Sequence, residues 1–419
     1  MKKFFLTALS IIALSSCEST FVDDPDDISY LSSHATTLEK QFEYFWHGIN
    51  NSYVFWDFET TDWDEVYDQY LPIFKELDQK GKRDGTLPNK EVQNVIDSLG
   101  SMFIDGHMII GFTNPYNDWN ELSYNVGWNN LQKRTGLTEF SILKDELVNS
   151  LSTLLYIYNP ERQCLQTESC VIKKGNDNYT SINTEIEKGI IYLRVPICNF
   201  SRYDEPDFLS YFDRFSNRIR YLSQSDQLKG IILDFRGNSG GFESDIDFWL
   251  QLFIEEPSIA LYNRAKNGLG KYDYGDWKAK IVQPDPERQI CPSKTPTVIL
   301  INNLSASGGE ICPSVLRTLP NSHTIGLPTF GATGSVSSLL STAIFHAGSF
   351  NYFKDYYPDI DNGIGAYARM SFSATKLFNS HSQTYECLEG VGVTPDEIVN
   401  NEGDDNQLQA AVDYIKRLQ

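Results

Sequence analysis

The carboxyl-terminal half of the chain alternates short apolar runs, rich in β-branched residues, with stretches of helical periodicity. In chain order, these runs and stretches cover residues 190–195 (IIYLRV), 208–222, 230–235 (GIILDF), 248–253 and 297–302 (TVILIN). Buried strands that alternate with helices are typical of α/β units. We therefore expect an α/β core over residues 189–419.

An aromatic amino-terminal half precedes this core. The segments that start at Phe42 (FEYFWHGINNSYVFWDF) and Asp62 (DWDEVYDQYLPIFKEL) carry apolar residues at helical spacing, which predicts two amphipathic helices with packed aromatic faces. A third helix is expected over 90–103, just before His107. The sequence thus predicts a helical domain over 37–112. Residues 113–188, where glycines mark turns, are expected to form a small β-rich insert.

The first residues have the pattern of an export signal. Two lysines precede an apolar run over 4–14, which is too short to span a bilayer but long enough for a signal-peptide core. The run ends in Leu-Ser-Ser-Cys17, which resembles the lipobox of bacterial lipoproteins. Residues 1–17 are expected to be a lipoprotein signal peptide whose Cys17 carries the lipid, and 18–36 an acidic tether. An ordinary signal peptide with a chance cysteine is the alternative.

Charge and cysteine content limit the partners. The formal net charge is −21, so we expect no nucleic-acid partner, because phosphate binding needs clustered Lys and Arg. Membrane attachment would depend on the lipid at Cys17. The other six cysteines fit neither a zinc knuckle nor a redox CxxC, so structural disulfides or buried thiols are expected, with no metal and no cofactor.

Two turns that follow predicted strands carry the chemistry. The strand at 297–302 leads into NLSASGGE and then a helical segment, which places Ser307 near a helix amino terminus. Unpaired N–H groups and the helix dipole favour negative charge there, as a tetrahedral oxyanion requires. A serine at this point can also be a simple helix cap, and Ser305 or Ser307 could be that cap.

The second turn, DFRGNSGG at 234–241, can offer further backbone N–H donors. It lacks the GxxxxGK[ST] and GxGxxG patterns of phosphate-binding loops, so nucleotide binding is not expected.

Four motifs occur in the order found in the tail-specific (C-terminal processing) and tricorn-core serine peptidases. They are DFRGNSGG, NLSASGGE, PTFGATG (328–334) and EGVGVTPD (389–396), and the aromatic amino-terminal segment resembles the helical region of tricorn-type members. The resemblance implies a crotonase/Clp-like spiral α/β catalytic core that follows an N-terminal helical domain.

The resemblance also implies roles for individual residues. Ser307 matches the nucleophile, and Gly308 and Gly240 match backbone donors of the oxyanion hole. Tail-specific proteases carry a lysine base after TFG, whereas this chain has Ala332. Tricorn-type members use a histidine and a glutamate, which His107 and Glu389 match.

In that scheme His107 is the general base, and Glu389 orients its ring or stabilises the imidazolium. Tricorn carries a serine before its histidine, where this chain has Gly106. Asp105 or Ser101 could substitute, or Glu389 could contact the ring directly.

The expected function is that of a serine peptidase that hydrolyses exported polypeptides through an acyl-enzyme. It would be a lipoprotein of a Gram-negative-type bacterium, periplasm-facing or exposed on the outer membrane. One alternative is a catalytically inactive, peptidase-like lipoprotein that binds peptides or a partner protein. A second is a lipoprotein that captures nutrients such as glycans.

Overall fold

The computed structural model describes residues 36–137, 168–174, 177–198, 206–268, 270–287, 289–290, 295–336, 343–346, 365–400 and 405–419. The expected signal peptide, Cys17 and nearly all of the acidic tether lie outside the described residues. None of the helices that the structure describes combines the length and apolar character needed to span a bilayer.

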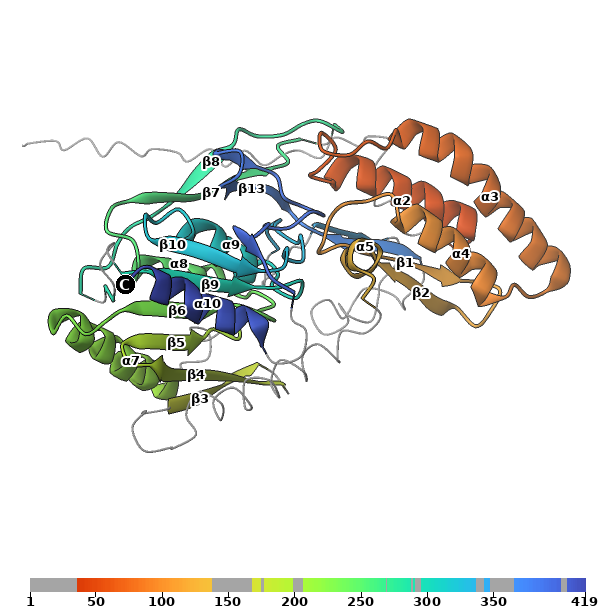
Figure 1. Cartoon of the computed structure of the whole chain (residues 1–419). Helices are drawn as coiled ribbons and strands as arrows, with labels where there is room; N and C mark the ends of the chain where they lie inside the picture. The colour runs from red at the N-terminus through yellow and green to blue at the C-terminus, as the bar shows by residue number, and fades with distance from the viewer. Residues whose placement is uncertain are drawn as a thin grey trace, which may run out of the picture.

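The amino-terminal unit is a layer of three helices on a four-stranded sheet. The helices are α2 (Leu38–Ser52), α3 (Trp63–Asp84) and α4 (Asn89–Gly100). The sheet has the order β11-β12-β1-β2. Its strands are β1 (Ile109–Asn114), β2 (Asn120–Asn125), β11 (Ala343–His346) and β12 (Ala366–Met370), and helix α5 (Val126–Thr135) follows β2. Figure 1 shows this unit beside the larger core, with α2, α3 and α4 on its outer side.

Local signals explain where these helices begin and end. Asp62 caps α3 by accepting the N–H groups of Asp64 and Glu65, and Gly85 ends that helix at φ 71°. The aromatic stripe of α2 packs on α3: the rings of Phe42 and Phe74 stack with centroids 4.8 Å apart. The expected helical region is confirmed, and its aromatic residues form a buried core.

The α/β core is built on a seven-stranded sheet of order β15-β10-β9-β6-β5-β4-β3. Five strands run parallel, namely β5, β6, β9, β10 and β15. At one edge β4 and β3 continue the sheet in antiparallel orientation. The strands are β3 (Glu168–Lys174), β4 (Asp177–Glu187), β5 (Ile190–Arg194), β6 (Gly230–Asp234), β9 (Thr297–Ile301), β10 (Ser322–Gly326) and β15 (Glu397–Ile398).

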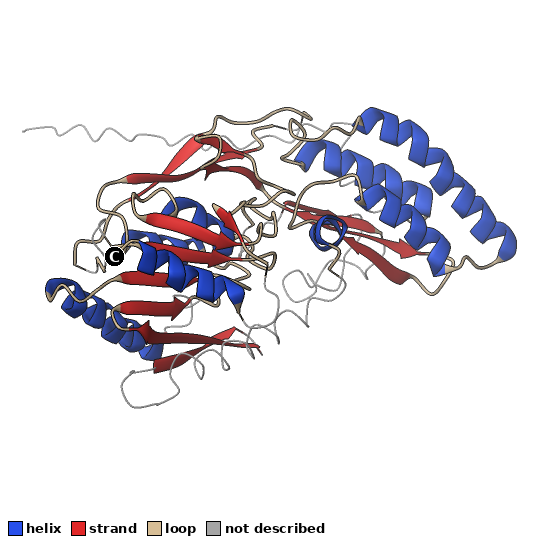
Figure 2. Cartoon of the chain, viewed as in Figure 1, coloured by secondary structure: helices blue, strands red, loops and turns tan. Residues whose placement is uncertain are grey.

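Alternate residues of the parallel strands face two different helical layers. Ile191, Ile231 and Ile299 pack toward a cluster that includes α7 (Pro206–Gln224), α8 (Glu243–Gln251) and α9 (Gly308–Leu316). Ile232 and Val298 face α10 (Asn406–Arg417) on the other side. Figure 2 shows α10 in front of the sheet with the other helices behind it. The expected α/β core is therefore confirmed, with both sheet faces covered.

A third sheet, of order β14-β13-β7-β8, packs on α8 and α9 of the core, and Figure 1 shows it at the upper edge of the core. Its strands are β7 (Ser258–Ala265), β8 (Lys278–Val282), β13 (Ser373–Asn379) and β14 (Thr384–Glu386). Arg264 on β7 bonds both carboxylate oxygens of Asp57 at 2.6 and 2.7 Å. The Arg264 guanidinium also lies 4.0 Å from the ring centroid of Tyr274 and 4.6 Å from that of Trp277. This contact links the two units.

The expected boundaries need two corrections. β3 and β4, expected within an insert over 113–188, belong to the core sheet, which therefore begins before Gly189. The amino-terminal sheet takes β11 and β12 from the carboxyl-terminal half, so that unit is not continuous in sequence. Strand pairing across more than 200 residues leaves no local pattern that a sequence reading can detect. Residues 138–167 of the expected insert lie outside the described residues.

Candidate active site

Ser307 stands in a strained turn between β9 and α9. Its backbone has φ 53° and ψ −117°. An ordinary cap residue has an extended backbone instead. The positive φ of Ser307, in a residue other than glycine, costs about 1–3 kcal/mol. The same strand-turn-helix placement presents the nucleophile in other serine hydrolases. Ser307 is half-buried and lines a cleft.

Ser305 has a different role. Its hydroxyl donates to the Phe235 carbonyl at 2.9 Å and accepts the N–H of Asn302 at 3.0 Å. Ser305 is fully buried. It joins the ends of β9 and β6, so Ser307 is the serine of this segment that faces the cleft.

A buried carboxylate holds the Ser307 turn. Glu310 accepts the N–H groups of Ser307 (3.0 Å), Gly331 (2.8 Å) and Ala332 (2.9 Å), together with the Thr329 hydroxyl. Burial raises the pKa of Glu310, and these bonds oppose the rise. The sequence analysis did not single out Glu310, although Ser-Gly-Gly-Glu has the spacing of a capping box.

The glycine turn packs directly on Ser307. The Ala306 N–H donates to the Asn238 carbonyl at 2.9 Å, and a Cβ on Gly240 would lie 2.7 Å from the Cβ of Ser307. The Gly240 N–H, however, donates to the Asn238 side chain at 2.8 Å. Gly240 is therefore committed to the turn, and its expected role as oxyanion donor needs correction.

Two other N–H groups remain beside Ser307. No described residue accepts the N–H of Gly308 or of Gly241, and Gly241 lines the cleft. Gly241 has φ 154°, and a Cβ there would lie 1.5 Å from the Cys198 carbonyl oxygen, so only glycine fits.

A buried ion-pair network fixes the base of the glycine turn. Arg236 donates to Asp234 and to Asp405, with contacts between 2.6 and 2.9 Å. All three side chains are buried, and Asp405 is also the N-cap of α10. Loss of one partner in such a network leaves an uncompensated buried charge. We therefore assign Arg236 a structural role, which is to hold the glycine turn in place.

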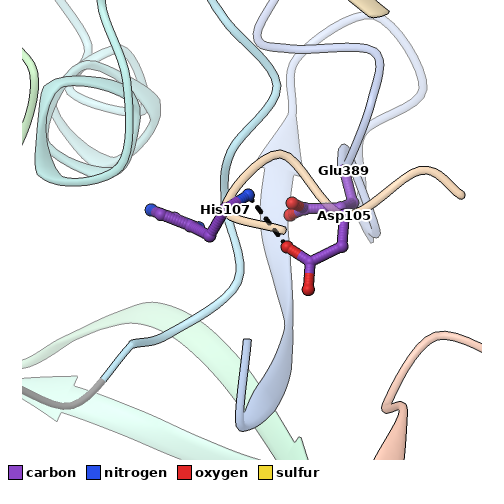
Figure 3. A group of neighbouring side chains, drawn as sticks. All are labelled: Asp105, His107 and Glu389. Carbon is purple, nitrogen blue, oxygen red and sulfur yellow. Dashed lines mark hydrogen bonds between the residues drawn. The ribbon is translucent and has the colours of Figure 1, made fainter. Parts of the chain in front are cut away.

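His107 comes from the amino-terminal unit, in the loop before β1. The backbone N–H of His107 donates to Asp105 Oδ1 at 2.9 Å, and the backbone N–H of Gly106 donates to Glu389 Oε1 at 2.6 Å. Figure 3 shows the imidazole ring pointing away from these two carboxylates. One ring nitrogen, one oxygen of Asp105 and one of Glu389 nevertheless lie within 4.8 Å of one another.

The ring itself is not bonded to an acid. His107 Nδ1 is buried without a hydrogen-bond partner among the described residues, which leaves Nε2 as the nitrogen available to the cleft. Burial and, secondarily, the charge of Arg369 lower the pKa of His107 to about 4. The imidazole is therefore neutral at pH 7.

Glu389 makes four bonds, none of them to the ring. Besides Gly106, it accepts the N–H and the hydroxyl of Thr333 at 2.7 and 2.8 Å and the N–H of Gly334 at 2.7 Å. Burial and the nearby Asp105 raise the pKa of Glu389. Glu389 thus joins the histidine loop to the loop after TFG, and the alternative in which it contacts the ring directly is not seen among the described residues.

The three side chains Asp105, His107 and Glu389 do not suit a metal ion. The carboxylate of Glu389 already accepts four donors. Asp105 accepts two donors from Ser371 in addition to the His107 N–H. Most of their lone pairs are therefore occupied by the protein.

His107 and Ser307 meet at one cleft of about 540 Å³. Apolar side chains form much of its wall, and Lys280 and Arg369 supply positive charge. No hydrogen bond joins the ring to the Ser307 hydroxyl in the described structure. The cleft brings together the two residues that the sequence analysis selected, from units that are far apart in sequence.

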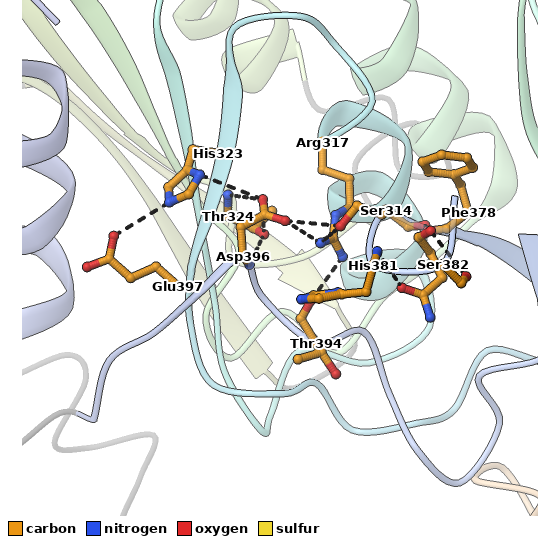
Figure 4. Close-up of polar contacts among 12 residues, drawn as sticks. Ser314, Arg317, His323, Thr324, Phe378, His381, Ser382, Thr394, Asp396 and Glu397 are labelled. Atoms are coloured by element: carbon orange, nitrogen blue, oxygen red, sulfur yellow. Dashed lines mark hydrogen bonds and ion pairs between the residues drawn. The ribbon is translucent and has the colours of Figure 1, made fainter. Parts of the chain in front are cut away.

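The fourth motif, EGVGVTPD, ends in a structural aspartate. Asp396 accepts the N–H and the hydroxyl of Thr324 at 2.9 and 2.7 Å and bonds Arg317 at 2.5 Å. Figure 4 shows this network at the end of α9, with His323 beside it. Asp396 therefore anchors the end of the motif.

Comparisons with known proteins agree with this arrangement. Residues 191–365 match the family model for peptidase family S41. The chain is 33% identical over 103 residues to the carboxy-terminal processing protease CtpA of Bacillus subtilis, which covers 25% of this chain and 20% of that protein. It is 22% identical over 217 residues to the nisin-resistance protein of Lactococcus lactis, covering 50% of this chain and 64% of that protein.

The fold has a solved counterpart. The crystal structure of a candidate peptidase from Parabacteroides merdae has a TM-score of 0.58 and 19% identity, with 90% of this chain and 96% of that one covered. The matches to the two curated relatives span less than two thirds of those proteins' length. The family match over residues 191–365, together with the ordered motifs that build the Ser307 turn, makes this part of the chain similar to peptidase family S41.

Proposed function

We propose that this chain is a serine peptidase that hydrolyses exported polypeptides through an acyl-enzyme on Ser307, with His107 as general base. The observation that carries the proposal is the strained Ser307, which faces the same cleft as an unprotonated imidazole. Strain of this kind persists where the surrounding structure enforces it, and it clusters at functional sites. Glu310 is the group that enforces it here.

The chemistry follows from the positions of the groups. The Ser307 oxygen attacks the substrate carbonyl carbon while its proton passes to His107 Nε2. The N–H of Gly308 and, in place of Gly240, that of Gly241 are the donors that we assign to the resulting oxyanion. When the C–N bond breaks, His107 returns the proton to the leaving amine. Water then repeats the sequence and releases the acyl group.

We assign Glu389 an indirect role. It holds the Gly106 backbone at 2.6 Å, and its charge supports the imidazolium from within 4.8 Å. Cleft closure on substrate is the step in which the ring and the Ser307 hydroxyl come into hydrogen-bond contact, since catalytic bonds are often long in unliganded enzymes.

A fluorophosphonate probe tests the proposal directly. We expect the folded wild-type protein to be labelled and to cleave unfolded polypeptides, and Ser307→Ala to lose both properties. The matched control is Ser210→Ala, an exposed serine on α7 that lies away from the cleft. Full turnover by purified Ser307→Ala would eliminate the proposal.

The second candidate function is a binding protein without turnover. The observation that favours it is the His107 ring, whose Nδ1 has no acid partner in the described structure. Absence of labelling in the wild type, together with measurable peptide binding, would select this function over hydrolysis.

Export and lipid attachment at Cys17 belong to the same proposal. They rest on the amino-terminal sequence alone. Metabolic labelling with a radioactive fatty acid tests them, and we expect the label in the wild type and its loss in Cys17→Ala.

A further inference from the structure

We propose that Arg369 binds a carboxylate in the part of the substrate that leaves after the first step. The inference rests on the proposed function and adds to it the chemistry that the cleft recognises. It starts from the position and the bonding of two cations that line the cleft, Lys280 and Arg369.

These two cations differ in what they contact. Lys280 is committed to ion pairs with Glu243 at 2.5 Å and with Asp247 at 2.9 Å. Arg369 is exposed, and among the described residues no acidic side chain pairs with it. An arginine fork matches a carboxylate with two parallel bonds, so an unpaired one in a cleft is suited to that ligand.

The pleat of the amino-terminal sheet aims Arg369 at the cleft. Ala368 and Met370, its neighbours on β12, are buried in the aromatic core under the helices. Because side chains alternate along a strand, Arg369 stands on the opposite face of the sheet. It pairs in register with Ile109, two residues after His107.

The location beside His107 decides which part of the substrate meets Arg369. The base that takes the serine proton later protonates the leaving amine, so the leaving segment passes His107. On the α8 side of Ser307 the wall includes apolar side chains, since a Cβ on Gly308 would lie 3.1 Å from Ile246, and it also includes the ion pair between Glu243 and Lys280. Ile246 and Ile311 line this wall. The acyl part of the substrate thus meets apolar side chains and an ion pair, and the leaving part meets a cation with which no described acidic side chain pairs.

The negative net charge of the molecule makes a local cation necessary for the binding of a carboxylate. The chain carries a formal net charge of −21, so its long-range field repels anionic peptides. A carboxylate ligand therefore depends on a local positive group. Charge-assisted bonds of this type contribute enough free energy to change affinity about 10- to 100-fold.

Occupation of Arg369 also affects the base. The charge of Arg369 contributes to the low pKa of His107, after burial. A carboxylate that neutralises this charge removes that contribution and makes His107 a stronger base. The same contact would then raise kcat as well as lower KM, which a purely structural arginine would not do.

Matched peptides test the proposal. One sequence is made with a free terminal carboxylate, with a terminal amide, and as an amide with one aspartate in the leaving segment. We expect kcat/KM to be about 10- to 100-fold higher for the free acid than for the plain amide. Cleavage of the aspartate amide at the higher rate assigns the site to a side-chain carboxylate, and its absence assigns it to the terminal one.

Variants separate recognition from structure. Arg369→Gln is expected to remove the difference between acid and amide, and Arg369→Lys to retain part of it. Arg214→Gln, at an exposed ion pair on α7, is the control and should keep the difference. Equal cleavage of acid and amide by the wild type, or an equal loss for both in Arg369→Gln, would overturn the proposal.

Binding measurements keep this test independent of turnover. Titration calorimetry with Ser307→Ala compares the same peptides without cleavage. A preference for the acid that disappears in the double variant Ser307→Ala, Arg369→Gln supports the site even if the fluorophosphonate probe shows that the wild type is not a peptidase. Equal affinity for acid and amide would refute the site even if the probe labels Ser307.

Discussion

Gly106 and Ala332 lie against each other. A Cβ on Gly106 would be 2.7 Å from the Cα and Cβ of Ala332 and 2.5 Å from the carbonyl oxygen of Gly331. These are the two positions at which the chain lacks a side chain that related peptidases use, a serine before the histidine and a lysine after TFG. Their contact lets the His107 loop sit beside the Ser307 turn, because Ala332 also accepts the Ser307 N–H at 3.1 Å.

Gly106→Ser should therefore be harmful rather than restorative. The added side chain meets the Gly331–Ala332 segment, so we expect a loss of about 1–3 kcal/mol in the free energy of unfolding and a large fall in activity. Urea denaturation and peptide cleavage measure the two effects. Gly275→Ala is the control, since its Cβ has only ordinary contacts beyond 3.6 Å. A stable, more active Gly106→Ser protein would contradict this account.

Glu310→Gln tests the carboxylate that holds the nucleophile turn. An amide can accept at only one atom, so its NH₂ group would face N–H donors of Ser307 or Gly331 in a fully buried site. We expect about 1–3 kcal/mol of destabilisation and slower labelling of Ser307 by fluorophosphonate. Glu287→Gln, at an exposed position, should match the wild type in both assays. Unchanged labelling would show that the turn does not need Glu310.

The pH dependence of labelling tests the base. His107 has a pKa lowered to about 4, so it stays neutral in mild acid. The labelling rate should remain high at about pH 5–6 and fall as the pH is lowered through about 4, where the ring gains its proton. The acids nearest the ring are Asp105, whose pKa burial raises to about 6, and Glu389, whose pKa burial also raises.

Arg369→Gln should shift this pH profile in a defined direction. Removal of the positive charge raises the pKa of His107, so the acid limb should move to higher pH. The probe carries no carboxylate, and its pH profile therefore reports the enzyme alone. Far-ultraviolet circular dichroism at each pH controls for unfolding. An unshifted limb in Arg369→Gln would mean that Arg369 does not act on His107.

The contact between Arg264 and Asp57 should control how the two units align. Arg264 is nearly buried, and it combines the ion pair with stacking on Tyr274 and Trp277. We expect Arg264→Ala to lower kcat more than it raises KM, since His107 and Ser307 come from opposite sides of this contact. Hydrogen exchange at residues 105–108 should increase. Arg83→Ala, at an exposed ion pair on α3, is the control and should change neither.

Local sequence determined the core strands, the helices and the turn that carries Ser307. Runs such as IIYLRV and TVILIN are buried on both faces, and their apolar composition shows this without any knowledge of partners. The strand-turn-helix at Ser307 is likewise contained within about 20 consecutive residues. His107 was found only through the resemblance, because an isolated histidine has no local signature.

Tertiary structure decided which groups are available for chemistry. The Gly240 N–H is bonded to Asn238, the Glu389 carboxylate bonds Gly106 and Thr333 instead of the ring, and β12 carries Arg369 into the cleft. Each of these facts is a contact between segments, or a choice between two acceptors, that depends on the packed geometry. Local propensity gives an element its type, whereas the partner of each polar group is set only when distant segments pack and exclude water.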